Sequence, residues 1–318
     1  MRYDGTIKSQ EDNLSFLQIL MEILVLVIYI GVGYFAKYKN FITEAGSRDM
    51  SKLVVNIAMP LLVISSMNIE YEASYVQNML IIACLSLLYF LVVTTITKKL
   101  SVLYADGKGN NRELRYCMIF GNAVFLGYPL SFAFFGNEGI MYASVFVALQ
   151  NIFQWTVGVQ NYSKDQDLLK RLKNLINPGL IAIFIGLFLF FFQIETPAFF
   201  LKIAKGIGAI SVPLALMIVG AQLDLQHLKD ALQNKGILAS VFTKCLVFPA
   251  IFLVILGFTP LDQTLKSILT IEIAAPVQAA AALFARNFNG DSVTAAKCVA
   301  LSTLVAIVTI PLFLVLIS

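Results

Sequence analysis

The chain has 318 residues, of which 58% are hydrophobic and 13% are charged, and its formal net charge at pH 7 is +4. Its mean hydropathy of +0.81 is far above that of a soluble domain. These values exclude a water-soluble globular protein and indicate an all-α integral membrane protein with little chain left for a soluble domain.

Apolar windows of about 20 residues predict ten membrane spans. In chain order the spans are 14–36, 51–67, 75–97, 114–135, 138–160, 176–193, 198–220, 236–258, 265–285 and 294–317. Residues 1–12 lack an apolar core preceded by basic residues, so they do not resemble a cleaved signal peptide.

The positively charged residues lie mostly on one side of these spans. Most of the 23 Lys and Arg residues fall in the odd-numbered loops, around Lys99, Arg171 and Lys229, whereas the even-numbered loops carry acids such as Glu70 and Glu195. Loops rich in Lys and Arg stay in the cytoplasm. We therefore expect a multi-pass plasma-membrane protein with both termini outside. The net charge reflects this topology and does not indicate a nucleic-acid partner.

The fourth span contains residues that weaken a continuous helix. Its centre reads GNAVFLGYP, from Gly121 through Asn122 and Gly127 to Pro129. Proline removes a backbone donor and glycine tolerates non-helical geometry, so we expect the helix to break here. In hydrocarbon such a break is tolerated only where it is buried in protein or lines an aqueous cavity. Kinked packing helices are the simpler alternative.

The fifth span has a polar face. Gln150, Asn151 and Gln154 lie within five residues of one another, beside Trp155. These amides are candidates for substrate contacts. Hydrogen bonding between neighbouring helices explains them equally well.

The cysteines and the histidine do not form a metal-binding or redox motif. Cys84, Cys117, Cys245 and Cys298 are widely separated in apolar spans, and the single histidine, His227, lies in a loop. We expect no disulfide framework, no metal and no cofactor. An intramembrane enzyme that depends on histidine is also not expected.

Two charged residues lie inside the last spans. Lys244 lies about seven residues inside the eighth span, and we expect its long stem to reach the cytoplasmic surface; attraction of an anion or pairing with an acid is the alternative. Glu272 lies four residues before Pro276 in the ninth span, where an ionised carboxylate is costly unless paired, hydrated or protonated. We expect Glu272 either to bind a proton or to bind a sodium ion together with backbone carbonyls freed at the break and Gln278; a structural carboxylate facing a wet crevice is the alternative.

Prolines at similar positions suggest that the chain consists of two repeats. Pro60 and Pro213 are 153 residues apart, and Pro129 and Pro276 are 147 residues apart. Ten spans divide into five and five, and an odd number of spans makes the second copy enter the membrane from the opposite side. The predicted parts are 1–160, a short cytoplasmic linker at 161–175, and 176–318. In this inverted repeat the fourth and ninth helices are both broken and cross near the midplane.

Several motifs together resemble the auxin efflux carrier family, which includes plant PIN-type carriers and bacterial permeases often assigned to malate or malonate. They are GNAVFLGYPL from Gly121, QNIFQWTVG from Gln150, VPLALMIVGAQL from Val212, APVQAAAA from Ala275 and STLVAIVTIP from Ser302. The resemblance covers essentially the whole chain. Each motif alone is weak, but their combination is specific.

This resemblance implies a ten-helix fold like that of bile acid symporters and NhaA-type antiporters. It also implies a scaffold domain, a transport domain holding the crossed helices, elevator-like movement and commonly a homodimer. The linker at 161–175 is far shorter than the cytoplasmic loop of many plant members. Regulation by phosphorylation of such a loop is therefore not expected.

The sequence thus predicts a secondary transporter of a small organic anion, such as a dicarboxylate or an auxin-like acid. A sodium-coupled symporter like those for bile acids and a non-transporting membrane sensor are the alternatives. The candidate substrate contacts are Asn122, Gly127, Pro129, Gln150, Asn151, Gln154, Pro276 and Gln278, and Glu272 is the candidate for ion coupling.

Overall fold

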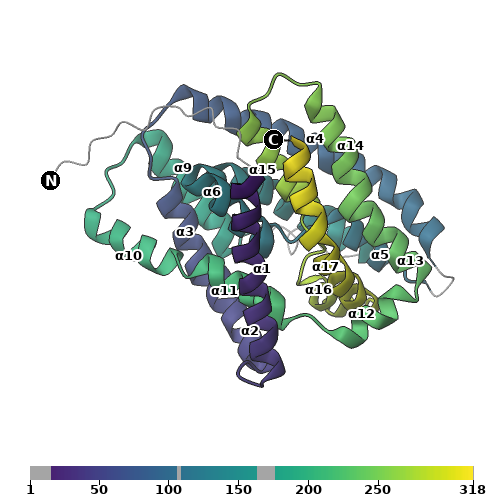
Figure 1. Ribbon diagram of the computed structural model, residues 1–318. Helices are drawn as coiled ribbons and strands as arrows, with labels where there is room; N and C mark the ends of the chain where they lie inside the picture. The colour runs from purple at the N-terminus through teal and green to yellow at the C-terminus, as the bar shows by residue number, and fades with distance from the viewer. Residues whose placement is uncertain (1–15, 106–108, 163–175, 318) are drawn as a thin grey trace.

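A computed structural model describes residues 16–105, 109–162 and 176–317 (Figure 1). Within these ranges the chain is helical, and its β-type pairing is an isolated bridge between Gly121 and Val277. Most of the predicted linker at 161–175 lies outside the described residues.

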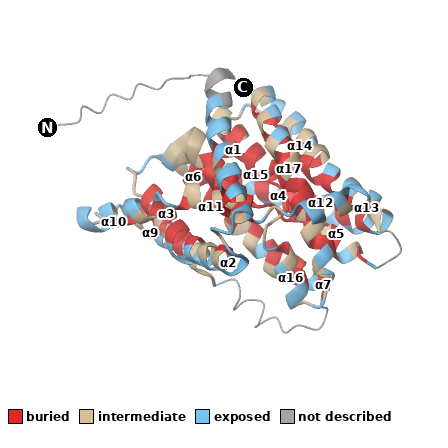
Figure 2. Cartoon of the chain, turned by 60° about the horizontal axis from the view of Figure 1, so that its bottom comes forward, coloured by how far each residue is buried: buried red, intermediate tan, exposed pale blue. Residues whose placement is uncertain are grey.

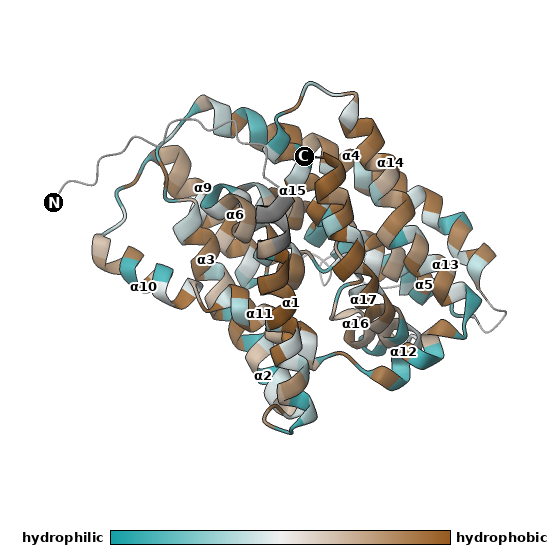
Figure 3. Ribbon diagram, viewed as in Figure 1, coloured by the Kyte–Doolittle hydropathy of each residue, from teal (hydrophilic) through white to brown (hydrophobic). Residues whose placement is uncertain are grey.

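Seven helical stretches of the described residues are long and apolar enough to cross a membrane, and a shorter apolar helix covers Pro178–Phe192. The seven stretches are Met21–Tyr38, Glu44–Ser66, Ala73–Tyr104, Ala123–Tyr162, Ala198–Ala221, Lys235–Gly257 and Ser292–Ile317. The hydropathy colours of Figure 3 show apolar residues along most of these helices. The chain is therefore a multi-pass membrane protein.

In the first part of the chain the helices are α1 (Phe16–Tyr38), α2 (Glu44–Leu53), α3 (Met59–Ser66), α4 (Ala73–Tyr104), α5 (Asn111–Ile119), α6 (Tyr128–Phe153) and α7 (Val159–Tyr162). Short π-helical turns join α2 to α3, lead into α6 and join α6 to α7. The predicted fourth and fifth spans meet inside α6 at Gly136, whose φ of 55° interrupts the helical backbone.

In the second part the helices are α9 (Pro178–Phe192), α10 (Ala198–Gly208), α11 (Ser211–Ala221), α12 (Leu225–Leu232), α13 (Lys235–Phe242), α14 (Phe248–Gly257), α15 (Gln263–Ala274), α16 (Ala281–Asn287) and α17 (Ser292–Ile317). A π-helical turn joins α13 to α14. Here too, predicted spans are divided: the ninth into α15 and α16, with non-helical residues between them.

Three prolines follow π-helical turns. Pro60, Pro129 and Pro249 each occupy the first or second position of an α-helix that continues directly from such a turn. A π-turn has one residue more per turn, which accommodates the missing proline N–H and the bulk of the ring. Pro129 therefore does not break its helix, and the break predicted there lies several residues earlier, after Ile119.

The helices pack in two groups. In the first group α1 packs along α11, and α3 packs against α9 and α10. In the second, α6 packs against α4 and α15, and α17 packs against α12, α15 and α16. Figure 1 shows α1, α2 and α11 beside α17, α16 and α12, where the two groups meet. We name each group after two of its helices, and the names do not denote ranges. The α1–α11 group comprises α1, α2, α3, α9, α10 and α11, and the α6–α17 group comprises α4, α6, α12, α15, α16 and α17.

Small residues allow the closest contact within the α1–α11 group. A Cβ atom on Gly33 would overlap the backbone of Met217, and one on Gly220 would overlap the backbone of Ile30. Close backbone approach at glycine is a usual way for membrane helices to associate, since lipid gives no hydrophobic driving force between them.

Large apolar side chains are exposed on the outer surfaces. They include Leu88 and Leu91 of α4, Phe184 and Phe188 of α9, and Ile251 of α14. Figure 2 shows buried residues concentrated in the interior, around α15, α17 and α4. An apolar exterior around a close-packed interior is what a bilayer requires of a helical protein.

Candidate functional site

The two broken segments meet each other at their breaks. The backbone N–H of Asn122 donates to the carbonyl of Pro276 at 2.7 Å, and the N–H of Gln278 donates to the carbonyl of Phe120 at 3.1 Å. These two bonds flank the antiparallel bridge between Gly121 and Val277. Each break thus satisfies backbone groups of the other, which otherwise cost several kcal/mol apiece when buried in an apolar medium. We call residues 120–122 and 275–278 the crossing.

Side chains from neighbouring helices complete the hydrogen bonding of the crossing. Gln150 donates from Nε2 to the Gly121 carbonyl at 3.0 Å and accepts from the Gly121 N–H at 3.3 Å. Ser302 accepts from the Val277 N–H at 3.0 Å. The Tyr116 hydroxyl donates to Gln278 at 3.2 Å. The crossing is therefore held by side chains of α6, α17 and α5.

The three amides of the predicted polar face of the fifth span do not all lie at the crossing. Gln150 belongs to the crossing, and Gln154 lies within hydrogen-bonding reach of Tyr116. Asn151 instead donates to the Val147 carbonyl of its own helix at 3.0 Å and lies 3.5 Å from the Asn177 amide at the start of α9. The structure does not bring Asn151 to the crossing.

Glu272 is fully buried, two residues before the end of α15. Ser131 Oγ donates to Glu272 Oε1 at 3.4 Å, whereas Oε2 has no hydrogen-bond partner among the described residues. A Cβ atom on Gly127 would overlap this carboxylate. Gly127 therefore makes room for the acid, which is a different role from the helix break predicted for it.

Of the predicted prolines, Pro276 lies in the crossing and Pro129 does not. The Pro276 carbonyl accepts the shortest backbone bond there, whereas Pro129 lies in the first turn of α6. The two prolines therefore do not occupy matching places at the two breaks. Gly121 and Val277 face each other instead, and the 156 residues between them agree better with the 153 between Pro60 and Pro213.

Lys244 does not reach the cytoplasmic surface. Its side chain lies in the π-turn between α13 and α14, is 1% exposed and donates from Nζ to the Ile273 carbonyl at 3.1 Å. The expectation of a surface-reaching lysine is wrong, because the nearby carbonyl at the end of α15 offers the ammonium a buried partner.

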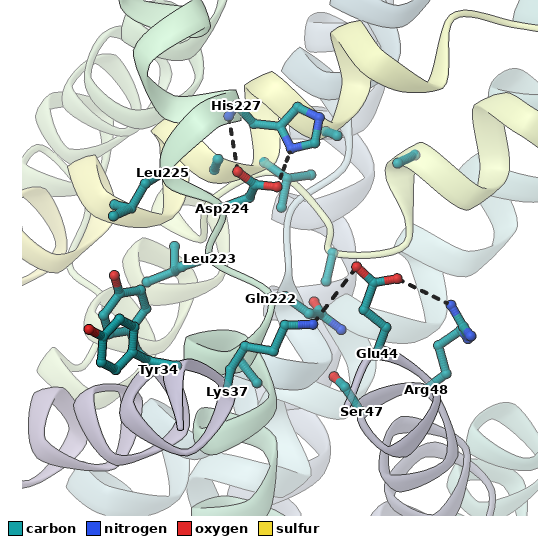
Figure 4. A pocket seen from close by; sticks show the side chains of 17 residues that line it. Tyr34, Lys37, Glu44, Ser47, Arg48, Gln222, Leu223, Asp224, Leu225 and His227 are labelled. Carbon is teal, nitrogen blue, oxygen red and sulfur yellow. Dashed lines mark hydrogen bonds and ion pairs between the residues drawn. The ribbon is translucent and has the colours of Figure 1, made fainter. Parts of the chain in front are cut away.

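A cavity of about 460 Å³ opens where the two helix groups meet (Figure 4). The α1–α11 group and the loop after it contribute Tyr34, Lys37, Tyr38, Glu44, Ser47, Arg48, Ala221, Gln222, Leu223 and Asp224. The other wall is formed by small aliphatic residues, Ala279, Ala282, Ala296, Val299 and Ala300, with Leu225 and His227 of α12. Ala279 directly follows Gln278, so this cavity extends to the edge of the crossing.

Charged groups gather in this cavity. Glu44 lies 3.8 Å from Lys37 and 4.0 Å from Arg48, so one carboxylate is shared by two cations. His227 Nδ1 lies 3.0 Å from Asp224. Partial burial alone would raise the pKa of Asp224, but hydrogen bonds from the backbone N–H groups of His227 and Gln226 lower the pKa overall. Asp224 therefore remains ionised at neutral pH.

Sequence reasoning did not identify Tyr116, Ser131 and Ser302 as residues of the site, nor the residues of the cavity. Isolated hydroxyl groups in apolar spans usually bond to their own helix, so they carry no distinctive signal. A signal for the cavity was present in the cluster of Lys37, Glu44 and Arg48 beside a predicted span end.

Comparison with known proteins gives consistent results. The sequence profile of the family described as membrane transport protein matches residues 18–171 and 166–314. An uncharacterized transporter of Methanocaldococcus jannaschii is 27% identical over 266 residues, which cover 80% of this chain and 84% of the relative. An uncharacterized transporter of Methanothermobacter thermautotrophicus is 22% identical over 305 residues, which cover 92% of this chain and 96% of the relative.

Proposed function

The chain belongs to the membrane transport protein family, and from this membership and its site we propose that it is a secondary active transporter of a small organic anion. Its relatives carry the name of transporters, which fits a protein that moves a solute and performs no chemical conversion.

The observation that carries this proposal is the cavity that reaches the crossing. Ala279, the residue after Gln278, lines it together with Ala282, and Lys37 and Arg48 also line it. A solute in this cavity lies beside these two cations and next to the crossing. Lys37 and Arg48 share the single carboxylate of Glu44, and this local excess of positive charge favours an anion. Amide groups such as those of Asn122, Gln150 and Gln278 suit carboxylate oxygens.

We propose alternating access by an elevator movement of the α6–α17 group along the α1–α11 group. Away from the cavity the two groups are sealed by apolar contacts, in which Leu26 and Ile30 of α1 cluster with Leu126, Leu130 and Ile310. An apolar seal of this kind lets one group slide past the other without leaving polar groups unpaired. The described conformation then corresponds to one end of the movement.

The remaining expectations about architecture belong to this proposal. We infer ten spans in two inverted repeats related through Gly121 and Val277, both termini outside, and a homodimer formed through the α1–α11 group. Under this topology the cavity opens to the cytoplasm. The two half-helices starting after the crossing then direct their positive N-terminal ends toward the substrate.

Uptake by the purified protein in liposomes tests the proposal. A panel of radiolabelled dicarboxylates and indole acids is offered while sodium and pH gradients are varied separately. We expect saturable uptake of at least one anion that exceeds protein-free liposomes and falls when Lys37 and Arg48 are replaced by glutamine. Saturable binding of an anion without uptake would instead favour a membrane sensor.

A further inference from the structure

Lys244 occupies an unusual position for a lysine in a membrane protein. It is 1% exposed, and its nearest polar partner is the Ile273 carbonyl at 3.1 Å. The ammonium also lies beside the other broken segment, the one that contains Gly121, since a Cβ atom on Gly121 would lie 3.2 Å from Nζ. This lysine, in the turn between α13 and α14, therefore bonds to the end of α15 and lies close to Gly121 of the crossing.

The ammonium bonds to the C-terminal end of one broken helix and lies near the segment that follows the end of the other. Helix α5 ends at Ile119 and α15 ends at Ala274, on either side of the Gly121–Val277 bridge. The last carbonyls of a helix lack partners within it, and each C-terminus carries a partial negative charge of about half an electron. Carbonyls freed at such half-helix ends are the groups that hold sodium in transporters with broken helices.

Glu272 adds a full negative charge to the same region. It precedes Ile273, its carboxylate is buried against Gly127, and Oε2 has no hydrogen-bond partner among the described residues. Lys244 and Glu272 form no direct ion pair within 4.0 Å in the described chain. The ammonium and the carboxylate thus bring opposite charges to the same part of the protein without bonding directly.

We propose that Lys244 is a built-in cation that takes the place of a coupling sodium ion at the crossing. The ammonium supplies one positive charge, donates to a freed helix carbonyl and neutralises the region around Glu272. A sodium ion at this position would need the same carbonyl and would be repelled by the ammonium. The inference concerns the coupling ion of the proposed transporter, so it deepens that proposal and leaves a proton as the mobile ion.

Removal of the ammonium should convert the crossing into a sodium site. Lys244→Ala vacates the place beside the freed Ile273 carbonyl and leaves the charge of Glu272, one residue earlier in the chain, without its cation; sodium is small enough to take that place. Thermal unfolding of purified wild type and Lys244→Ala is measured in sodium chloride and in choline chloride at equal ionic strength. We expect no sodium-specific shift for the wild type and an increase in midpoint of roughly 4 °C or more for the variant.

Two control variants test whether the sodium response depends on the charges of Lys244 and Glu272. Lys235→Ala removes an exposed lysine at the start of α13 and should respond to sodium like the wild type. Lys244→Ala combined with Glu272→Gln should lose the sodium response, because the carboxylate that would bind the ion is gone. Sodium-specific stabilisation of the wild type that disappears in Glu272→Gln would overturn the proposal.

A second measurement keeps the proposal testable if Lys244→Ala does not fold. If Lys244→Ala yields no monodisperse protein, Lys244→Met is compared with Lys244→Met/Glu272→Gln by size-exclusion chromatography. If Lys244 balances the charge of Glu272, removing the acid as well should restore most of the monodisperse protein that Lys244→Met loses. Failure of the double variant to recover would contradict the inferred balance. These readouts need no substrate, so they can fail independently of the transport proposal.

Discussion

At the scale of single residues, the central question is what Glu272 does. The side chain is fully buried, its Oε1 accepts from Ser131, and Gly127 provides the space that it occupies. A buried carboxylate is stable either when protonated or when a cation lies near it. Lys244, held by the carbonyl of the next residue, supplies such a cation.

Replacing Glu272 by glutamine tests its role in ion coupling. Because glutamine imitates the protonated acid, we expect the variant to keep exchange of the anion identified by the liposome panel but to lose uptake driven by a pH gradient, by at least about tenfold. Uptake and exchange are measured over a series of pH values and sodium concentrations. Identical curves for variant and wild type would remove Glu272 from the mechanism.

At the scale of helices, the molecule depends on two kinds of close approach. In the α1–α11 pair, glycines let the backbones touch, as Gly33 does against Met217. In the crossing, backbone groups from two interrupted helices bond to one another. Both contacts tolerate little displacement. Each can be tested by comparing a substitution at the contact with a similar substitution at a position outside it.

Gly33→Ala should destabilise the α1–α11 pair. The new methyl group has no room against the Met217 backbone, so α1 must shift, at a cost of about 1–3 kcal/mol. Gly31→Ala is the matched control, because a Cβ there has nothing within 4 Å and lies on the exposed side of the same helix. Thermal unfolding in detergent is the measurement, and equal midpoints for the two variants would contradict this packing argument.

Pro276→Ala and Pro129→Ala should have different consequences. Alanine at 276 lets α15 extend toward the crossing and displaces the carbonyl that Asn122 uses, so we expect transport to fall strongly while folded protein remains. Alanine at 129 lies within a helix that already accommodates proline, so we expect transport close to that of the wild type. Uptake into liposomes is measured for both variants. A stronger loss of transport for Pro129→Ala would show that the helix break important for transport lies at Pro129.

At the scale of the whole molecule, two helix groups meet along an apolar seal and a charged cavity. The seal contains Leu26 and Leu126, and the cavity is lined by Lys37, Glu44 and Arg48 among others. In the elevator movement that we propose, the apolar seal closes the path on one side of the membrane and the cavity gives access from the other. The side to which it opens follows from the topology.

Membrane topology is checked by labelling single cysteines in a background without Cys84, Cys117, Cys245 and Cys298. Lys99 lies near the end of α4 and Glu195 in the connection between α9 and α10, and both are exposed. We expect an impermeant maleimide to label Glu195→Cys in intact cells and Lys99→Cys only after permeabilisation. Labelling of both positions in intact cells would contradict the proposed inverted repeat.

The sequence by itself determined the class of the molecule. Composition and apolar windows require a multi-pass helical membrane protein, and the combined motifs indicated the auxin efflux carrier family, which the family comparison confirms. Interruption of the fourth and ninth spans was also predictable, because proline and glycine act locally on the backbone. The structure describes such interruptions after Ile119 and Ala274.

Only the tertiary structure decided which residues form the site. Pro129 was expected at a break but lies in a helix, because a π-turn absorbs its effect. Asn151 was a candidate substrate contact but bonds to its own helix, and Lys244 was expected at the surface but lies buried beside the crossing. Hydrogen-bond partners such as Gln150 for Gly121 are far apart in sequence. Such pairings depend on how helices pack against one another, which local sequence patterns do not encode.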